Sequence, residues 1–429
     1  MSAPENLPAA DNGLLRFLTC GSVDDGKSTL IGRLLFDTKT ILADTLRAIA
    51  RTSAKRGQAA LDLSLLTDGL QAEREQGITI DVAYRYFSTG TRKYIIADAP
   101  GHEQYTRNMV TAASTADLAI ILIDARKGVL TQTRRHSTIA HLMGIPHLLV
   151  AVNKMDLVGY QQEVFQRIQA DYLDFAGKLG IAEVRFMPIS ALNGDMIVDR
   201  GDQLGWYAGP SLLEILESVS AASAEQENHD PRFRFPIQYV CRPQQADDPQ
   251  LHDYRGFMGR IESGEIAIGD EVTHLPSLRK THIKDIQIAG LSLPAAFAEQ
   301  SITLLLADEI DISRGDMLVN SAALPAIRQS ISANLCWLSE TPLDPQRRYL
   351  VRHTTRDAKA KLANIDSRLN INTLEREAAS GLAMNDIAQV TFRLAQPLFA
   401  DTYAENRVTG AFIVIDESSN NTVGAGMII

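Results

Sequence analysis

The sequence predicts an α/β domain with a mainly parallel, doubly wound sheet, followed by two antiparallel β-barrel domains. Two observations predict this fold class. Up to about residue 220, short continuous apolar runs alternate with segments of helical periodicity, as in a sheet whose strands are buried on both faces. After about residue 232, apolar and polar residues alternate and turn residues recur every few positions, which is typical of antiparallel barrels.

The bulk composition is that of an ordinary globular protein of two to four domains. The chain has 429 residues, of which 45% are hydrophobic and 22% are charged, and its net charge is −10. This acidic balance argues against nucleic acid or an anionic membrane as a general partner. The three cysteines lie far apart, and neither a signal-peptide pattern nor an apolar run long enough to cross a bilayer is visible. We therefore expect a cytoplasmic protein that binds neither nucleic acid nor membranes.

The elements follow one another in the order that this fold class requires. We expect strands at residues 14–20, from about 84, and at 93–98, 118–124, 147–153 and 184–190, and helices at 28–36, 102–114, 131–143 and 161–179. The domain boundaries that we predict are a flexible tail at 1–13, the α/β domain at 14–220, a small and polar linker at 221–231, and barrels at 232–325 and 326–429.

A phosphate-binding loop follows the first predicted strand. Residues 21–28 read GSVDDGKS and match the pattern G-x-x-x-x-G-K-[S/T], whose backbone N–H groups surround the phosphates of a nucleotide. Lys27 would reach the β- and γ-phosphates and Ser28 would bind Mg²⁺, at the N-terminus of the following helix. The nucleotide-binding residues predicted here are Gly21, Ser22, Val23, Asp24, Asp25, Gly26, Lys27, Ser28 and Thr29.

Two further segments are placed to sense the γ-phosphate. Asp98, Pro100 and Gly101 follow the strand at 93–98, where Asp98 could hold Mg²⁺ through water and the N–H of Gly101 could meet the γ-phosphate. Residues 73–80 read EREQGITI, which is either a charged surface loop or a switch whose Thr79 hydroxyl reaches Mg²⁺ in the triphosphate state.

Three residues are the candidates for catalysis and three for metal binding. His102 directly follows the predicted γ-phosphate sensor, so we expect it to orient the attacking water, the role that Gln has in small GTPases. The catalytic candidates are therefore His102, Lys27 and Thr79, and the metal candidates are Ser28, Thr79 and Asp98.

The base is predicted by two later segments. Residues 153–156 read NKMD after a buried strand, so that Asp156 can accept hydrogen bonds from the two donors of guanine. Asn153 can donate to the ring acceptors, and the stem of Lys154 can cover one face of the ring. Ser190, Ala191 and Leu192 follow the last strand and would direct a backbone N–H toward guanine O6. The predicted cofactors are therefore GTP or GDP with Mg²⁺, and the first domain is a P-loop GTPase domain.

These motifs together resemble a known class of GTPases. GSVDDGKST, EREQGITI, DAPGHEQY, NKMD and the closing VGAGMI are similar to those of the elongation factor Tu/1-alpha class. The resemblance is closer to one family in that class, the GTPase subunits of bacterial sulfate adenylyltransferase. One departure from the translation factors supports this: they have His between the P-loop Asp and Gly, whereas this chain has Asp25.

The resemblance implies an activity and a partner. It implies that the chain hydrolyses GTP while bound to a smaller, ATP-binding catalytic subunit that makes adenylylsulfate and diphosphate from ATP and sulfate, in a heterodimer or larger assembly. Some relatives continue into an adenylylsulfate kinase domain, and we expect that activity to be absent here, since no second P-loop is visible. Two alternatives remain: an elongation factor that delivers aminoacyl-tRNA, and a nucleotide-binding scaffold that does not hydrolyse GTP. Co-purification of a smaller ATP-binding subunit or of aminoacyl-tRNA would separate the first two.

Overall fold

The structure is a computed structural model of the whole chain that describes residues 13–55, 61–66, 81–220, 232–243 and 254–429. Thr79, the predicted linker at 221–231 and all but the last residue of the predicted N-terminal tail lie outside the described residues. The chain divides into two compact units, which are considered separately. The first comprises Met1–Ala222 with Ile371–Glu375, and the second comprises Ser223–Asn370 with Arg376–Ile429.

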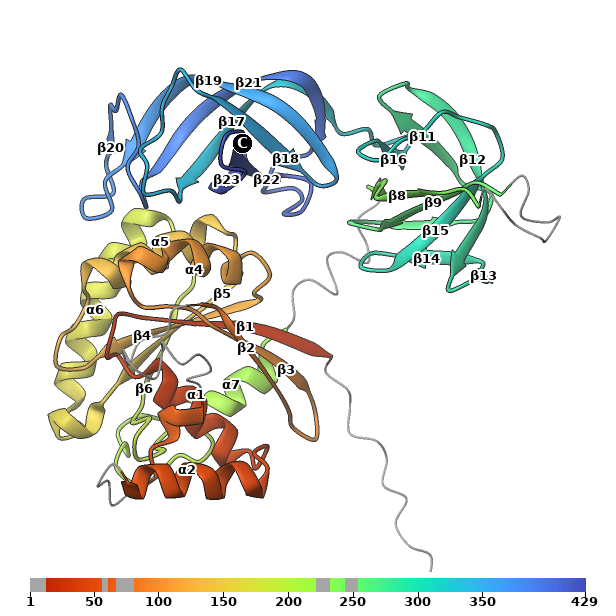
Figure 1. Cartoon of the computed structure of the whole chain (residues 1–429). Coiled ribbons are helices and arrows are strands. Elements are labelled where there is room, and N and C mark those ends of the chain that lie inside the picture. The colour runs from red at the N-terminus through yellow and green to blue at the C-terminus, as the bar shows by residue number, and fades with distance from the viewer. Residues whose placement is uncertain (1–12, 56–60, 67–80, 221–231, 244–253) are drawn as a thin grey trace, which may run out of the picture. The chain divides into compact units, whose positions relative to one another are not determined.

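The first unit is built on a six-stranded sheet with the strand order β2-β3-β1-β4-β5-β6 (Figure 1). Its strands are β1 (Leu14–Cys20), β2 (Ala83–Ser88), β3 (Lys93–Asp98), β4 (Leu118–Asp124), β5 (His147–Asn153) and β6 (Arg185–Pro188). All neighbouring strands run parallel except β2, which is antiparallel to β3. The predicted mainly parallel sheet is therefore confirmed. Since β1 lies between β3 and β4, the chain leaves the sheet in opposite directions on either side of β1, and ligands bind at such a switch point.

Helices and short helical turns connect these strands. They are α1 (Lys27–Asp37), α2 (Ala43–Lys55), η1 (Leu63–Leu66), η2 (Glu103–Tyr105), α4 (Thr106–Ala113), α5 (Thr131–Leu142), η3 (Met155–Val158), α6 (Gln162–Leu179) and α7 (Leu212–Ser218). The helices expected at 28–36, 131–143 and 161–179 are confirmed to within one residue at each end. The helix expected at 102–114 begins later, because a 3₁₀ turn occupies its first part.

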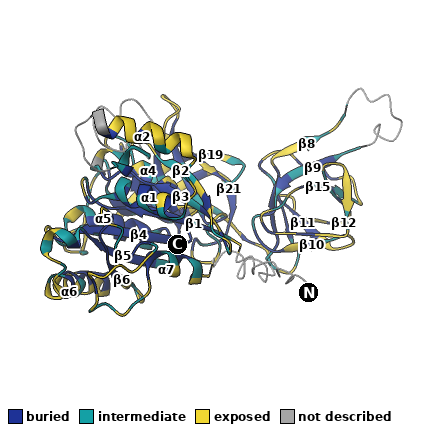
Figure 2. Ribbon diagram, turned by 90° about the horizontal axis from the view of Figure 1, so that it is seen from below, coloured by how far each residue is buried: buried dark blue, intermediate teal, exposed yellow. Residues whose placement is uncertain are grey.

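Burial explains why the sequence forms this sheet. Every residue of β4 is buried, and Figure 2 shows the central strands as the buried interior of this unit. Leu15, Ile120 and Leu149, on three neighbouring strands, belong to one apolar cluster with residues of α1 and α7. Helix α2 is different, because most of its residues are exposed in Figure 2, and of its apolar side chains Ile49 is buried.

The second unit contains two large antiparallel sheets and a two-stranded one (Figure 1). The first large sheet, with the added pair β10-β14, is formed by β7 (Arg234–Pro236), β8 (Tyr239–Cys241), β9 (Gly256–Arg260), β10 (Glu265–Ala267), β11 (Glu271–Leu275), β12 (Arg279–Ile288), β13 (Leu291–Leu293), β14 (Ala295–Phe297), β15 (Ser301–Leu306) and β16 (Met317–Asn320). The second is formed by β17 (Ala326–Trp337), β18 (Arg348–His353), β19 (Arg356–Leu369), β20 (Arg376–Glu377), β21 (Ile387–Ala400), β22 (Ala411–Asp416) and β23 (Thr422–Ile428). It closes into a barrel because β18 pairs with both β22 and β19.

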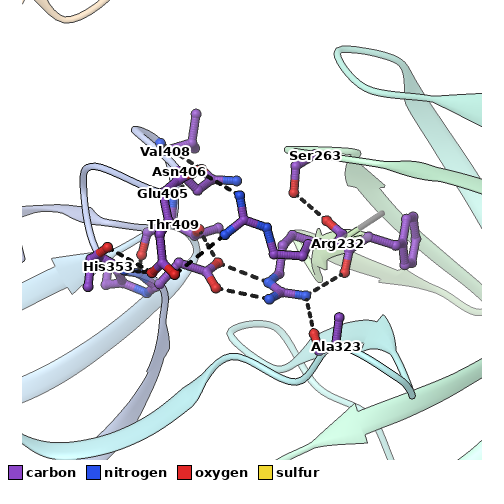
Figure 3. A network of polar contacts seen from close by, with 12 residues as sticks. Arg232, Ser263, Ala323, His353, Glu405, Asn406, Val408 and Thr409 are labelled. Atoms are coloured by element: carbon purple, nitrogen blue, oxygen red, sulfur yellow. Dashed lines mark hydrogen bonds and ion pairs between the residues drawn. The ribbon is translucent and has the colours of Figure 1, made fainter. Parts of the chain in front are cut away.

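A buried ion pair links Arg234, in strand β7 of the first large sheet, to Asp401, which directly follows strand β21 of the second. Figure 3 shows the polar network around this pair, with Thr409 and Ala323 labelled. The Nε and Nη2 atoms of Arg234 donate to the two carboxylate oxygens of Asp401, each at 2.9 Å. The hydroxyl of Thr409 also donates to Asp401, at 2.6 Å, and Nη1 of Arg234 donates to the carbonyl oxygen of Ala323. Arg234 is 1% exposed, so its charge is compensated by a carboxylate rather than by water.

Candidate functional site

The predicted phosphate loop connects β1 to α1. Asp24 and Gly26 have φ values of 67° and 95°, and the second of these is a conformation that glycine adopts without strain. Helix α1 then begins at Lys27 and has no acidic residue in its first turn. The partial positive charge of its N-terminus is therefore directed at the loop without a competing carboxylate in that turn, as an anion site requires.

Lys27 lies inside the loop rather than in solvent. Its Nζ atom donates to the carbonyl oxygens of Gly21 at 3.0 Å and Ser22 at 3.1 Å. Burial lowers the pKa of Lys27, and the carboxylates of Asp98 and Asp25 oppose this shift. The ammonium group is thus held in place by two uncharged carbonyl acceptors, which phosphate oxygens could replace.

The segment Asp98–Gly101 meets the phosphate loop from the neighbouring strand. Asp98 is the last residue of β3 and accepts a hydrogen bond from the hydroxyl of Thr19 at 3.2 Å. A Cβ atom on Gly101 would stand 2.5 Å from Nζ of Lys27 and 2.7 Å from the carbonyl oxygen of Gly21. Glycine is therefore required at 101, and its backbone lies against the lysine that is expected to bind the γ-phosphate.

The residues present fit a nucleotide with Mg²⁺. The space between the phosphate loop and Gly101 is so narrow that a single Cβ atom on Gly101 would fill it. The hydroxyl of Ser22 is buried and has no hydrogen-bond partner in the described part of the chain. Within the described residues no group of three or more His, Cys, Asp or Glu side chains is placed to hold a metal. Mg²⁺ does not require one, because it usually keeps several waters and binds through one or two protein oxygens and the substrate phosphates.

The base-recognition segments lie beside the phosphate loop. Asn153 ends β5, its Nδ2 atom donates to the carbonyl oxygen of Asp25 at 2.8 Å, and its Oδ1 atom accepts from the N–H of Ala191 at 3.0 Å. The hydroxyl of Ser190 donates to Oδ1 of Asp156 at 2.7 Å. Three segments that are far apart in the sequence therefore form one cluster, and the half-buried carboxylate of Asp156 is oriented by Ser190.

Asp124 fixes Lys154 beside this cluster, and the motifs alone did not predict it. It ends β4, and Nζ of Lys154 lies 3.0 Å from its Oδ2 atom while Arg126 binds both of its oxygens. Burial alone would raise the pKa of Asp124, but hydrogen bonds from Arg126 and Lys154 hold this pKa well below its usual range. Lys154 also donates to the carbonyl oxygen of Asp24, so its stem is fixed between the two loops.

Arg33 of α1 is a second residue that the motifs did not reveal. Its Nε atom donates to the carbonyl oxygen of Ala191 at 3.3 Å, and its Nη2 atom donates to that of Leu192. The helix that carries the phosphate loop therefore also fixes the segment expected to face guanine O6.

Asp25 places a carboxylate inside the phosphate loop. One of its oxygens accepts from the N–H of Ser22 at 2.6 Å, and the other is buried without a hydrogen-bond partner in the residues that the structure describes. Burial raises the pKa of Asp25 to about 6, against the opposing charge of Lys27.

His102 follows Gly101 and is half-buried. Its Nδ1 atom accepts from the N–H of Gln104 at 3.3 Å, and its ring lies 6.0 Å from that of Tyr105. His102 therefore directly follows the segment that is expected to meet the γ-phosphate. The role of His102 stays a prediction, as does that of Thr79.

No helix among the described residues is both long enough and apolar enough to cross a membrane.

The comparisons with known proteins concern both units. The family described as the elongation factor Tu GTP binding domain matches residues 12–223, and the family described as GTP-eEF1A C-terminal domain-like matches residues 330–429. Among solved structures, Sup35 complexed with GDP is 22% identical, with a TM-score of 0.43 and coverage of 99% of this chain and 95% of that chain.

Much higher identity is found with curated proteins. Sulfate adenylyltransferase subunit 1 of Cellvibrio japonicus is 54% identical over 97% of this chain and 86% of that protein. The protein of the same name from Laribacter hongkongensis is 54% identical over 97% of this chain and 85% of its own length. The bifunctional enzyme NodQ of Rhizobium sp. is 53% identical over 97% of this chain and 63% of its own length. The chain therefore belongs to the sulfate adenylyltransferase subunit 1 family, and its first domain is an elongation factor Tu-type GTP-binding domain.

Proposed function

We propose that this chain is the GTP-hydrolysing subunit of a sulfate adenylyltransferase. In this function it couples GTP hydrolysis to the synthesis of adenylylsulfate and diphosphate from ATP and sulfate by a smaller catalytic subunit. The observation that carries the proposal is the 54% identity, over 97% of the chain, to proteins of that name. The clustering of the phosphate loop with the NKMD segment supports GTP as the nucleotide.

We assign a separate role in GTP binding and hydrolysis to each group of residues. Lys27 would bind the β- and γ-phosphates, and the N–H of Gly101 would meet the γ-phosphate. Ser28, Thr79 and Asp98 would hold Mg²⁺, which neutralises charge on the phosphates when bound. His102 would orient the attacking water, and Asn153, Lys154 and Asp156 would bind guanine.

Coupling requires that the nucleotide state of this chain bias the conformations of its partner. Sulfate is a poor nucleophile and the phosphosulfate anhydride is high in energy, so adenylyl transfer runs uphill. GTP hydrolysis can drive that reaction only through differential binding between the switch states and the partner. We place the complex in the cytoplasm, as a heterodimer or a larger assembly, and the three free cysteines are consistent with a reducing compartment.

The test is a reconstitution with the smaller catalytic subunit. Adenylylsulfate formed and GTP consumed are measured together for the wild-type chain and for His102→Ala. We expect the variant to bind GTP as the wild type does but to hydrolyse it at least about 10²-fold more slowly, because the water is no longer oriented. Adenylylsulfate should fall in parallel. His282→Ala, an exposed histidine in the second unit, is the matched control.

Two results would count against the proposal. Equal turnover by His102→Ala and the wild type would remove His102 from the mechanism. An adenylylsulfate yield that is the same with GTP, with GDP and without nucleotide would show that hydrolysis is not coupled. If the chain instead retained aminoacyl-tRNA in a GTP-dependent way and did not bind the catalytic subunit, it would act as an elongation factor.

A further inference from the structure

Three cations stand in one row on the outer face of the C-terminal barrel. In the strand register, Arg348 of β18 is paired with Lys361 of β19, and Lys361 is paired with Arg393 of β21. All three are exposed, and their neighbours along the strands, such as Tyr349 and Ala360, point inward and are buried. Residues that are directly opposite on antiparallel strands have Cβ atoms about 5 Å apart. Arg348, Lys361 and Arg393, the cation row, therefore span about 10 Å of sheet surface.

The cation row lacks compensating charge in the second unit. Within the described residues, none of its three side chains makes a hydrogen bond or an ion pair. Carboxylates near it in the register are already engaged. Asp357 accepts two hydrogen bonds from Arg352, at 2.7 and 2.8 Å, and Glu417 lies 3.7 Å from Lys359.

Folding does not explain such a row. Like charges directly opposite each other destabilise a sheet, and any polar side chain could occupy these outward positions. General basicity does not explain it either, because residues 326–429 contain 11 Lys and Arg against 11 Asp and Glu, and the whole chain has a net charge of −10. Three cations without a partner among the described residues therefore lie side by side on a domain whose charged residues balance.

We propose that the cation row is a docking surface for an acidic face of the catalytic subunit. This proposal rests on the proposed function, which requires such a partner. The row is exposed, and its spacing matches carboxylates at positions i and i+4 of a helix, whose Cβ atoms lie about 5–6 Å apart. Two of its three members are Arg, which is enriched in protein interfaces and binds carboxylates with two parallel hydrogen bonds.

The same features do not favour nucleic acid as the occupant. Surfaces that bind single strands combine positive charge with aromatic rings on which bases stack. The exposed large aromatic side chains of the described residues, Phe36, Tyr84, Tyr86, Tyr239 and Phe297, all lie outside the C-terminal barrel.

The test compares two triple variants of the full chain in binding to the purified catalytic subunit. One reverses the cation row, with Arg348→Glu, Lys361→Glu and Arg393→Glu. The matched control reverses three exposed cations of the first unit, with Arg167→Glu, Lys178→Glu and Arg185→Glu, so that both variants have the same net charge. Binding is measured at low and at high salt, and GDP affinity and thermal melting are measured alongside to show that each variant is folded.

We expect the row variant to raise the Kd for the catalytic subunit at least tenfold at low salt, and the control to stay within about twofold of the wild type. The binding of the wild type should weaken as salt is added, and that of the row variant should respond less. A neutral series, with Gln at the same three positions, should give a smaller loss in the same direction, and it replaces the reversal if that variant does not fold.

The outcomes separate the inference from the proposed function. If the wild type binds the catalytic subunit and the row variant binds it equally well, the cation row is not the docking surface, and the proposed function stands. If the wild type does not bind the catalytic subunit, the proposed function fails and the occupant named here fails with it. If the row variant loses binding to tRNA or duplex DNA but not to the subunit, the row is a nucleic-acid surface and the inference is wrong.

Discussion

Asp25 shows how a single residue can set the charge of a phosphate site. Its carboxylate is buried in the loop and organises it by accepting from the N–H of Ser22. The same carboxylate repels an incoming phosphate when it is ionised. Because burial raises its pKa to about 6, Asp25 is ionised in the folded protein at neutral pH at a cost in stability.

The first prediction concerns Asp25→Asn. In the unfolded chain the carboxyl has its ordinary pKa of 3.8, and in the folded chain the pKa is about 6. Between these two values the folded state binds more protons, so the stability of the wild type should fall as the pH rises from about 4 to 6 and then stay level. Asparagine keeps an acceptor for Ser22 without a charge, so the variant should be more stable at pH 7.5, by at most about 3 kcal/mol.

Thermal melting of the nucleotide-free protein between pH 4 and 8 tests this, with Asp62→Asn, a partly exposed carboxylate of the same unit, as the control. Nucleotide affinity above pH 7 should also rise in Asp25→Asn. A variant that melts below the wild type at pH 7.5 would show that the carboxylate stabilises the loop.

At the scale of residues, the motifs led to side chains that the structure brings together, and they missed the residues that support them. Asn153, Asp156 and Ser190 come together as expected because each follows a strand of the same sheet, and parallel strands bring their carboxyl ends to one edge. Asp124 ends a strand in the same way and could have been found by that rule. Arg33 could not, because a cation on a helix gives no sign in the sequence of which distant carbonyl groups it will reach.

At the scale of elements, the contact between the phosphate loop and the Asp98–Gly101 segment leaves no room for an added methyl group. The second prediction is that Gly101→Ala lowers GDP and GTP affinity at least about tenfold, because the new Cβ atom would stand 2.5 Å from Nζ of Lys27 and force it or the segment to move. Gly90→Ala is the matched control, since a Cβ atom there would have nothing within 4 Å. Equal nucleotide affinities for the two variants would mean that the loops move apart at no cost.

The ion pair between the two large sheets gives the third prediction. Asp401→Ala should destabilise the second unit by about 3–5 kcal/mol, because it leaves the buried guanidinium of Arg234 without its carboxylate. The exposed pair Arg352–Asp357 has similar geometry, with distances of 2.7 and 2.8 Å, and Asp357→Ala should cost about 1 kcal/mol or less.

Calorimetric melting of the full chain compares the two variants. The double variant Arg234→Met with Asp401→Leu should recover part of the loss, since a buried pair can be replaced by apolar residues of similar volume. A melting temperature of Asp401→Ala as high as that of Asp357→Ala would show that water reaches Arg234.

The elements that the sequence predicted are those whose burial leaves a strong pattern. Strands β4 and β5 are buried along their whole length or nearly so, and their apolar runs are unbroken. Helix α2 was not predicted, although its apolar and polar residues are segregated as in an amphipathic helix, and it buries Ile49 and Ser53. Helix α7 was not predicted either, because a helix of seven residues is too short to show a clear period. Its capping box, formed by Ser211 and Glu214, is a start signal that could have been used.

At the scale of the whole molecule, the proposed function requires that events at the guanine site reach a second protein. By linkage, if GTP changes the affinity of the chain for the catalytic subunit, the subunit must change the affinity for GTP by the same factor. Coupling therefore has to be tested with a change that alters which nucleotide binds while leaving the partner's ATP and sulfate sites untouched. Asp156 offers that change, since we expect it to recognise the base and not the phosphates.

The fourth prediction is that Asp156→Asn transfers the coupling from GTP to xanthosine triphosphate. Xanthine has a carbonyl where guanine has an amine, so an asparagine amide can donate to it, and Ser190 can still donate to the remaining oxygen at position 156. GTP affinity should fall about 10²- to 10⁴-fold, since the amide NH₂ cannot accept from the guanine amine and the hydrogen bond from guanine N1–H no longer has a charged acceptor. In the reconstituted complex, xanthosine triphosphate should then raise the adenylylsulfate yield of the variant, and GTP should not.

The wild-type complex, with the two nucleotides exchanged, is the internal control for this experiment. Because ATP, sulfate and the catalytic subunit are the same in both arms, a switch of the driving nucleotide can come only from the base site of this chain. A contaminating GTPase would consume GTP in both arms, and it would not make the adenylylsulfate yield depend on which of the two nucleotides is supplied. If GTP still drove the variant as well as the wild type, Asp156 would not recognise the base, and the link from the NKMD segment to adenylylsulfate synthesis would be lost.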